Sequence, residues 1–422
     1  MRTLFSGGRV FTGGMLRTVD FLTDGGTISS VGRDISPGGA DRIIDCKNRV
    51  IIPGFADVHV HLREPGFFMK ETVEAGTRAA ARAGYTQVCA MPNLSPPPDS
   101  LEHLQMQLDI IERDAAVRVL PYGCITVGQK GAGELVDFDA LAPFVAGFSD
   151  DGRGVQCEDL MREAMRRVKK TGKLIAAHCE DDALIRGGYL HDGDYARAHR
   201  HPGIPSESEW RQLERDLRLV RETGCRYHAC HISAKESVAL LRKAKADGLP
   251  VSAETAPHYL LIDDSMIEDD GRFKMNPPIR AAADREALVE GLIDGTIDMI
   301  ATDHAPHTQE EKVGGLRNSV MGVIGLETAF PALYTGLVLT GMITLEMLLE
   351  RMCTAPRRVF RLPGGLNEGQ VADLAILDLE REYTINPGEF LSKGRSTPFE
   401  GWPVRGEAIT TYVNGRIVWN KE

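Results

Sequence analysis

The stretch Asp57-Val58-His59-Val60-His61-Leu62-Arg63 follows the apolar run Val50-Ile51-Ile52 and begins the pattern that decides the fold. Alternate side chains of a β-strand share one face, so His59 and His61 are expected to point the same way. Two imidazoles on one rigid strand provide half of a divalent-metal site, and Arg63 on the same face provides a guanidinium group suited to a carboxylate. The sequence therefore predicts a metal-dependent enzyme that acts on an anionic substrate.

Strand-like and helical segments alternate about eight times after this stretch, a pattern typical of parallel βα units. The expected strands span residues 56–61, 86–91, 117–125, 144–148, 174–178, 226–231, 251–254 and 297–301. The expected helices between them include residues 70–83, 101–114, 159–171, 207–223, 234–247 and 284–294. Eight units predict an α/β fold, a closed (β/α)8 TIM-type barrel over residues 53–365, with the active site at the carboxyl ends of its strands.

Both ends of the chain contain short strand-like runs separated by Gly-rich turns. One of them is an expected hairpin around Asn414-Gly415. Neither end is large enough to bury a sheet face alone. We therefore expect residues 1–52 and 366–422 to form one small β-sandwich-like domain built from both termini.

Polar side chains gather where the expected strands end, which is unlikely to be coincidence in a barrel whose chemistry lies at that edge. The set consists of His59, His61, Asp151, His178, His231 and Asp303. Four histidines and two carboxylates can hold two metal ions about 3.5 to 4 Å apart when one carboxylate bridges them. Asp151 is the expected bridge, and Asp303 is the expected general base and acid. Zinc is the default metal for such ligands, although cobalt or manganese would also fit.

Other polar residues near these positions have alternative interpretations. Asp150 adjoins Asp151, and spacing alone leaves either one as the bridge. His228 and His304 have odd spacing relative to the expected ligands, which favours packing or hydrogen bonding on the opposite face. His258 is expected to support the site, and the remaining histidines of the 186–205 stretch are expected on a surface excursion.

Bulk composition limits the partners and the compartment. A net charge of −11 and a pI near 5.6 argue against a general nucleic-acid or anionic-membrane surface. The chain has no apolar run long enough to span a bilayer, and its start lacks the apolar stretch of a signal peptide. The eight scattered cysteines are expected to be reduced thiols of a cytoplasmic protein.

Further motifs accompany the histidine pair along the chain. They are Arg63-Glu64-Pro65-Gly66, Lys70-Glu71-Thr72, Met91-Pro92-Asn93, Phe148-Ser149-Asp150-Asp151-Gly152, Met275-Asn276-Pro277-Pro278-Ile279-Arg280, Thr302-Asp303-His304-Ala305-Pro306-His307 and Gly325-Leu326-Glu327-Thr328-Ala329-Phe330-Pro331. With these motifs the chain resembles the type I dihydroorotases of the amidohydrolase superfamily over essentially its whole length. The histidine pair alone would mark only the superfamily, whereas the whole set is far more specific.

The resemblance implies a binuclear zinc enzyme with two Zn²⁺ per subunit. One zinc would be held by His59, His61, Asp151 and Asp303, and the other by Asp151, His178 and His231. The implied substrate-binding residues are Arg63, Asn93 and His307 for the carboxylate, Asn276 for the ring amide, and backbone around Met321 and Gly322 for the other ring edge. The implied reaction is the reversible cyclisation of N-carbamoyl-L-aspartate to L-dihydroorotate and water in pyrimidine (UMP) biosynthesis, with Asp303 transferring protons.

Two rival functions remain open at this point. Hydantoinases and allantoinases are known for a carboxylated lysine at the bridging position, where this chain has Asp151. A non-catalytic dihydroorotase-like scaffold for an aspartate transcarbamoylase would usually lose metal ligands, and this chain keeps all six expected ones. The family often dimerises, so a homodimer and a possible transcarbamoylase association are expected. Residues 313–320 depart from the family pattern, which leaves the conformation of the 308–322 loop open.

Overall fold

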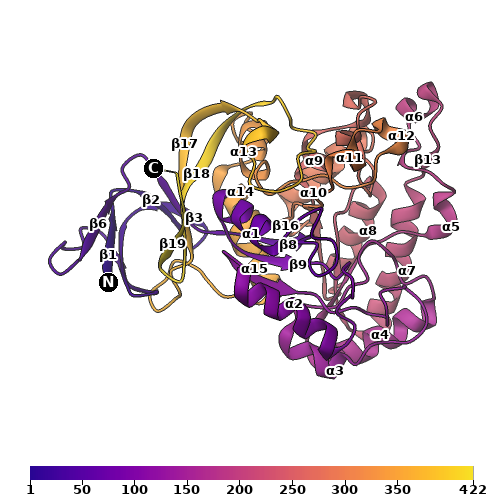
Figure 1. The fold of residues 1–422 in the computed structure, drawn as a ribbon, viewed down its shortest axis with the longest axis horizontal. Coiled ribbons are helices and arrows are strands. Elements are labelled where there is room, and N and C mark those ends of the chain that lie inside the picture. The colour runs from indigo at the N-terminus through magenta and orange to yellow at the C-terminus, as the bar shows by residue number, and fades with distance from the viewer. Residues whose placement is uncertain (422) are drawn as a thin grey trace.

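Strands from both ends of the chain form one end of the molecule in the computed structural model, which describes residues 1–421 (Figure 1). A six-stranded sheet has the order β19-β18-β17-β7-β2-β3. Its strands are β2 (Arg9–Thr12), β3 (Met15–Thr18), β7 (Val50–Pro53), β17 (Leu374–Thr384), β18 (Pro403–Val413) and β19 (Arg416–Asn420). A four-stranded sheet of order β5-β4-β1-β6 comprises β1 (Arg2–Ser6), β4 (Asp20–Asp24), β5 (Thr27–Gly32) and β6 (Arg42–Asp45).

The two chain ends also share a hydrophobic core. Phe5 and Phe21 stack with ring centroids 4.5 Å apart, and Tyr412 packs edge-on against Phe5. The expected hairpin is confirmed, because Val413 of β18 pairs with Arg416 of β19. Asn414 and Gly415 between them have φ angles of 52° and 70°, the left-handed conformations that a type I′ turn requires.

The remaining parallel strands are paired in a cyclic order. The ladders run β8-β9-β10 and β11-β14-β15-β16. Isolated parallel bridges connect them: Phe148 pairs with both Gly123 and Ile175, and His304 pairs with Val60. The strands are β8 (Phe55–Val60), β9 (Tyr85–Ala90), β10 (Arg118–Pro121), β11 (Leu174–Ala177), β14 (Arg226–Ala229), β15 (Val251–Thr255) and β16 (Met299–Ile300).

The expected strand at residues 144–148 is wrong. A 3-10 turn, Ala142–Phe144, occupies its start, and the rest forms no regular strand. Ala146 still donates from its backbone to Pro121 O at 2.8 Å, and Phe148 donates to Leu174 O at 3.0 Å. The segment therefore bridges its neighbours on both sides but is too short for a ladder. The third and eighth strands are also shorter than expected.

Helices follow the strands of this ring (Figure 1). Those longer than eight residues are α1 (Val73–Arg82), α2 (Leu101–Asp114), α4 (Glu158–Thr171), α7 (Glu207–Thr223), α8 (Lys235–Ala246) and α10 (Ala282–Asp294). The predictions for α2 and α7 agree with the structure at both ends. Ser100 caps α2 by accepting a hydrogen bond from His103 N, and Gly224, with φ of 67°, ends α7 in the left-handed conformation.

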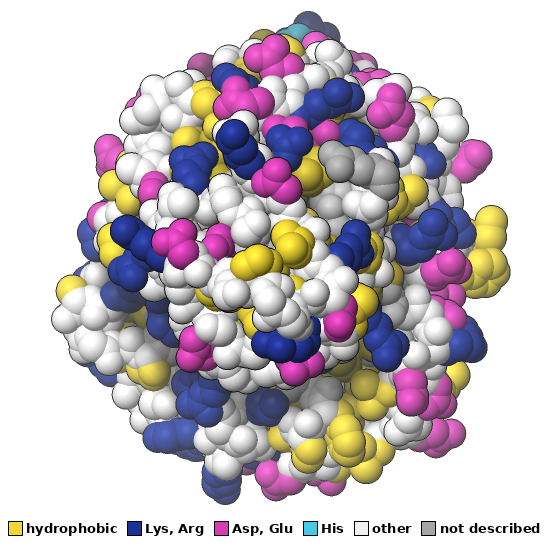
Figure 2. Space-filling view, turned by 90° about the vertical axis from the view of Figure 1, so that its left-hand side faces the viewer, with side chains coloured by type: hydrophobic (Ala, Val, Ile, Leu, Met, Phe, Trp, Pro, Cys, Tyr) yellow, Lys and Arg dark blue, Asp and Glu magenta, His cyan; other side chains and the backbone are white. Residues whose placement is uncertain are grey.

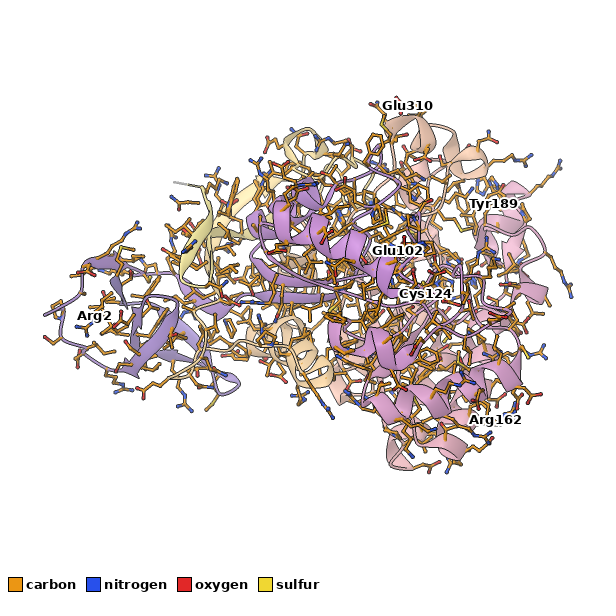
Figure 3. The ribbon with its side chains drawn as sticks, turned by 60° about the horizontal axis from the view of Figure 1, so that its bottom comes forward. Arg2, Glu102, Cys124, Arg162, Tyr189 and Glu310 are labelled. Carbon is orange, nitrogen blue, oxygen red and sulfur yellow. The ribbon has the colours of Figure 1, made fainter. Side chains whose placement is uncertain are left out.

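Short elements complete the fold. They are α3 (Phe138–Leu141), α5 (Asp182–Ile185), α6 (Asp194–His199), α9 (Pro257–Leu261), α11 (Gln309–Lys312), α12 (Gly315–Asn318), α13 (Ala329–Leu333), α14 (Leu345–Leu349) and α15 (Ala355–Phe360), with the strand pair β12 (Leu190–His191) and β13 (Gly203–Ile204). The excursion that contains β12 and β13 lies far from the sheets: Figure 3 shows Tyr189 and Arg2 at opposite ends of the molecule.

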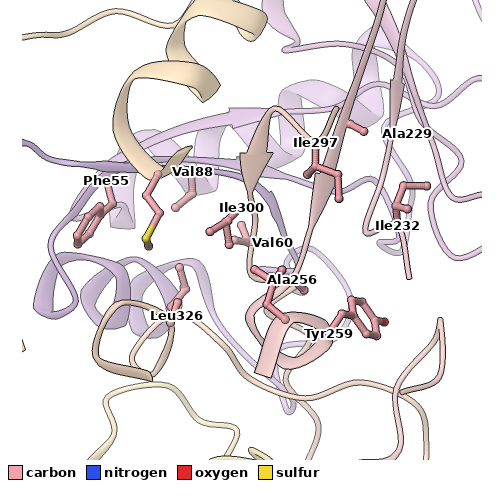
Figure 4. Packing of buried hydrophobic residues seen from close by; sticks show 14 of the residues in the cluster. Phe55, Val60, Val88, Ala229, Ile232, Ala256, Tyr259, Ile297, Ile300 and Leu326 are labelled. Atoms are coloured by element: carbon pink, nitrogen blue, oxygen red, sulfur yellow. The ribbon is translucent and has the colours of Figure 1, made fainter. Parts of the chain in front are cut away.

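The core of the ring is built from apolar strand residues. Val60, Val88, Ile297 and Ile300 are buried, and Figure 4 shows them packed together between the strands. Phe55 extends this core toward α13, where its ring lies 5.2 Å from that of Phe330. This packing fixes the strands whose ends carry the site.

The surface of the protein carries charged side chains of both signs. On the face at the sheet end, Lys and Arg side chains are interspersed with Asp and Glu (Figure 2). All eight cysteines are free thiols, and all but Cys157 are buried. Among residues 1–421, no helix is long and apolar enough to cross a membrane.

Candidate active site

The six predicted ligands converge from five places on the ring. His59 lies in β8 and His61 just after it, while His178, His231 and Asp303 follow β11, β14 and β16. Asp151 follows the bridge at Phe148 and lies at the centre. Its Oδ1 is 3.4 Å from His59 Nε2, 3.6 Å from His231 Nε2 and 3.7 Å from His178 Nδ1, and its Oδ2 is 3.5 Å from His61 Nε2.

Like Asp151, Asp303 approaches the Nε2 atoms of His59 and His61. Its Oδ1 is 3.0 Å from His61 Nε2 and 3.6 Å from His59 Nε2. Burial raises the pKa of this carboxyl group, but the hydrogen bond with His61 and the charge of His59 outweigh it and lower the pKa to about 2. Asp303 is therefore a carboxylate at neutral pH.

The donor atoms of this cluster fit divalent cations. Two triads, His59–His61–Asp151 and Asp151–His178–His231, each bring their donor atoms within 4.8 Å of one another, and Asp151 belongs to both. Among the described residues, His59 Nε2, Asp151 Oδ1 and His231 Nδ1 are buried without a hydrogen-bond partner. Buried polar atoms are rarely left unpaired, so His59 Nε2 and Asp151 Oδ1, which lie 3.4 Å apart, are suited to metal ligation, and His231 directs its Nε2 toward the same oxygen.

Asp151, and not Asp150, faces the histidines. Asp150 accepts hydrogen bonds from the backbone of Ile125 and Thr126 at 2.8 and 3.2 Å, and from Gly131 N at 3.2 Å. These contacts use its carboxylate to hold the 125–131 loop. Spacing left the choice open because adjacent residues can both reach the edge of a ring.

Two further residues orient the strand-one histidines. Glu254 Oε1 lies 2.7 Å from His59 Nδ1, and Asn93 Oδ1 lies 2.7 Å from His61 Nδ1. Each contact places a proton on Nδ1 and leaves Nε2 directed at Asp151. Glu254 is a functional residue that the sequence reasoning missed, although it ends the expected seventh strand at the same edge as the ligands.

The predicted site residues surround one cavity of about 280 Å³. His59 is the exception among them: it is fully buried and does not line the cavity. The cavity lining includes the five other expected ligands and the expected substrate-binding residues Arg63, Asn93, Asn276, His307, Met321 and Gly322. The structure therefore brings together all the residues that the sequence selected.

The Arg63 wall of this cavity is held rigidly. Arg63 is 7% exposed and donates from Nε to Pro306 O at 3.2 Å. His307 donates from Nε2 to Met321 O at 2.8 Å, while its Nδ1 accepts from Lys70 Nζ at 3.2 Å. Burial and the charges of Arg63 and Lys70 lower the pKa of His307 to about 3, so its ring is neutral.

Asn276 also lines the cavity. Its Nδ2 donates to Glu180 Oε1 at 2.8 Å and lies 3.2 Å from His178 Nε2. Its Oδ1 is buried and has no hydrogen-bond partner within residues 1–421. Asn276 thus contacts a predicted ligand and keeps a free acceptor for another group.

Three site residues have strained backbone conformations. Arg63, His231 and Asp303 have φ angles of 64°, 31° and 47°, in the left-handed region that non-glycine residues rarely adopt. Such strain persists only where the surrounding structure enforces it, and it concentrates at functional sites.

The other histidines have supporting contacts. His228 Nε2 lies 3.0 Å from Glu254 Oε2 and its Nδ1 lies 2.8 Å from Ser252 Oγ, which confirms the hydrogen-bonded role expected for it. His304 Nδ1 accepts from Gly325 N at 3.2 Å. Burial lowers the pKa of His258 to about 4, so it is neutral beside the site.

Comparisons with known proteins agree with this geometry. Residues 48–237 match the family model described as Dihydro-orotase-like. Proteins named Dihydroorotase from Bacillus cytotoxicus and Bacillus cereus are each 48% identical to the chain over 426 aligned positions, covering 100% of this chain and 99% of theirs.

Solved structures of cyclic-amide hydrolases share the fold. The L-hydantoinase (dihydropyrimidinase) from Arthrobacter aurescens matches with a TM-score of 0.89 and 27% identity, covering 99% of this chain and 96% of that one. The dihydropyrimidinase from Brevibacillus agri matches with a TM-score of 0.86 at 21% identity, over 100% and 95% of the two chains, which is a likeness of fold alone. On the full-length sequence identity, the chain belongs to the dihydroorotase family.

Proposed function

We propose that this protein is a dihydroorotase, which interconverts N-carbamoyl-L-aspartate and L-dihydroorotate plus water. The observation that carries the proposal is the position of Arg63. Its buried guanidinium group lines the same 280 Å³ cavity as Asp151 and Asp303. A fixed guanidinium group pairs with a carboxylate through two hydrogen bonds, so it selects a cyclic amide that carries a carboxylate. It also explains how a chain of net charge −11 accepts an acidic substrate.

The ligand cluster supports two zinc ions per subunit. His59, His61, Asp151 and Asp303 would hold one, and Asp151, His178 and His231 the other. When bound, such ions lower the pKa of a water molecule to about 7 and polarise a carbonyl group. Asp151 would belong to both ligand sets, since its Oδ2 lies 3.5 Å from His61 Nε2 and its Oδ1 lies 3.6 Å from His231 Nε2 and 3.7 Å from His178 Nδ1.

Asp303 is the proposed proton carrier. In the hydrolytic direction, water adds to the ring carbonyl carbon and the ring C–N bond breaks. Asp303, a carboxylate at neutral pH, accepts the proton that the water loses and gives it to the departing nitrogen. In the cyclising direction the same carboxylate takes the proton from the ureido nitrogen and returns it to the leaving water.

The substrate-binding residues would then orient the ring. Arg63 would pair with the carboxylate, with Asn93 and the neutral His307 beside it. Asn276 has a free Oδ1 for an N–H of the ring amide, and the Met321–Gly322 backbone would contact the other edge. Fixed orientation of this kind converts binding energy into rate.

Further features of the assembly belong to the same proposal. The cyclic strand pairing supports a closed (β/α)8 barrel over residues 53–365, and the mixed sheet supports a composite domain of residues 1–52 and 366–422. A homodimer and association with an aspartate transcarbamoylase follow from the family resemblance, and a cytoplasmic location follows from the scattered cysteines. Gel filtration of the protein, alone and with a transcarbamoylase, tests the homodimer and the transcarbamoylase association.

The decisive experiment measures metal content and turnover on a panel of cyclic amides. Two equivalents of zinc with turnover of L-dihydroorotate support the proposal. Turnover of hydantoin or allantoin alone would replace it with the function of the structurally similar hydantoinases. Absence of both metal and turnover would indicate the scaffold function.

A further inference from the structure

Lys312 is a buried lysine that does not line the cavity. It is the last residue of α11, and it is 7% exposed. Its Nζ donates to three backbone carbonyls: to Gly322 O at 2.7 Å, to Val320 O at 2.8 Å and to Lys274 O at 3.1 Å. These acceptors come from two segments that are far apart in the sequence.

The three contacts use the full donor capacity of the ammonium group. A charged lysine has three N–H donors, whereas the neutral amine has two, so three carbonyl acceptors match the charged form. Burial and the nearby charge of Lys274 lower the pKa of Lys312 to about 7, while the charges of Asp270 and Glu311 oppose this shift. Burying a charge costs free energy. If this position only filled space, an apolar side chain would be expected there, so the presence of a lysine indicates that its hydrogen bonds matter.

The two segments that Lys312 joins both contribute residues to the lining of the cavity. Val320 and Gly322 flank Met321, and Lys274 is two residues before Asn276. The two segments also contact each other directly, since Gly322 N donates to Lys274 O at 3.0 Å. Gly322 has φ of 128°, and a Cβ atom there would lie 2.9 Å from His307 Nε2, so this backbone has little room to move.

The neighbouring residue Glu311 contacts the part of the cavity lining that contains His307. Its carboxylate lies 2.8 Å from Lys70 Nζ and 3.3 Å from His307 Nδ1. A capping box between Thr308 and Glu311 fixes the turn on which Glu311 and Lys312 lie. One short turn therefore directs an acidic side chain to His307 and a basic side chain to the Met321–Gly322 backbone.

We propose that Lys312 is a positioning residue that sets substrate affinity by joining the Met321–Gly322 backbone to the segment that carries Asn276. This inference rests on the proposed function, in which Asn276 and the Met321–Gly322 backbone contact the two edges of the substrate ring. Lys312 does not line the cavity, and its Nζ hydrogen bonds go to backbone carbonyls and not to a predicted metal ligand, so its loss should loosen the pocket and leave the proton transfer of Asp303 in place.

The test compares Lys312→Met, Lys312→Gln and Lys312→Arg with the control Lys130→Met, an exposed lysine on another loop. Zinc content, KM and kcat on L-dihydroorotate are measured for each. We expect Lys312→Met to raise KM by about tenfold or more with kcat changed much less, and Lys312→Arg to recover part of the loss. A KM within about twofold of the control, or equal loss in Lys312→Arg and Lys312→Met, would overturn the proposal.

Hydrogen exchange provides a readout that needs no substrate. The Gly322 amide, which donates to Lys274 O, should exchange faster in Lys312→Met than in the control, while the β-strand amides of the ring keep their protection. Unchanged exchange at Gly322 would overturn the positioning role even in a protein with another activity. If Lys312→Met does not fold, Lys312→Gln, which keeps two donors, carries the same comparison.

Discussion

Glu254 holds His59 in the orientation that metal ligation requires. Its Oε1 lies 2.7 Å from His59 Nδ1, and its Oε2 lies 3.0 Å from His228 Nε2. Burial raises the pKa of Glu254, but the charge of His59 and the hydrogen bond with His228 hold it well below its usual value. A carboxylate behind a ligating histidine fixes the tautomer and increases the basicity of the ring.

Replacing Glu254 by Gln should therefore weaken metal binding. The amide keeps the size of the side chain but not its charge, and loss of such partners typically lowers metal affinity by about 10- to 100-fold. Zinc retained after dialysis against graded chelator concentrations measures the effect. Glu163→Gln, on the exposed face of α4, is the control, and equal retention in both variants would remove Glu254 from this role.

Asp303→Asn should separate metal binding from proton transfer. The other ligands remain, so we expect much of the zinc to be retained while kcat falls by at least about a hundredfold, in the range for loss of a general acid–base group. Zinc analysis and kcat on L-dihydroorotate are measured on the same preparation. A rate near that of the unmodified protein would exclude Asp303 as the proton carrier.

Arg63→Met should reduce substrate affinity more than turnover. A charge-assisted pair is worth about 1.5–3 kcal/mol, which corresponds to a KM raised by roughly 10- to 150-fold. Arg153→Met, at an exposed arginine, serves as the control. An unchanged KM in Arg63→Met would contradict the carboxylate clamp, and the metal content should be the same in both variants.

Two regular rules predicted which of the metal-ligand candidates would lie together. Alternation in a strand puts His59 and His61 on one face, and parallel strands in a ring bring their carboxyl ends together. His178 and His231 follow from the second rule, since His178 comes directly after the buried apolar strand β11 and His231 comes two residues after the end of β14. The same regularity made the bounds of α2 and α7 predictable from caps and apolar spacing.

Features that depend on contacts across the ring could not be predicted. Glu254 contacts His59, 195 residues away, and Lys312 contacts Lys274 O, 38 residues away, and no local pattern encodes those two contacts. The segment 144–148 has an apolar composition typical of a strand, but its hydrogen bonds go to neighbours that are themselves short. The choice between Asp150 and Asp151 depends on the backbone donors of the 125–131 loop that hold Asp150, and spacing does not specify them.

Glu327 predicts a pH dependence of stability that is independent of the metal site. Its side chain is 4% exposed and lies 3.2 Å from Arg82. Burial raises its pKa from 4.5 to about 7, despite hydrogen bonds from the backbone of Leu391 and the charge of Arg82. The folded protein therefore binds this proton more tightly than the unfolded chain does. The contribution to stability is fully present below pH 4.5 and is lost as the pH rises through about 7.

Glu327→Gln removes this titration, because the amide is neutral at every pH. The free energy of unfolding of the variant minus that of the unmodified protein should rise between pH 5 and pH 8 by a few kcal/mol. Urea unfolding at pH 5, 6, 7 and 8 measures it, with Glu382→Gln, at an exposed position of β17, as the control. A difference that stays constant with pH, or falls, would show that the Glu327 carboxyl group is already ionised at pH 5 in the folded protein and that Arg82 outweighs burial.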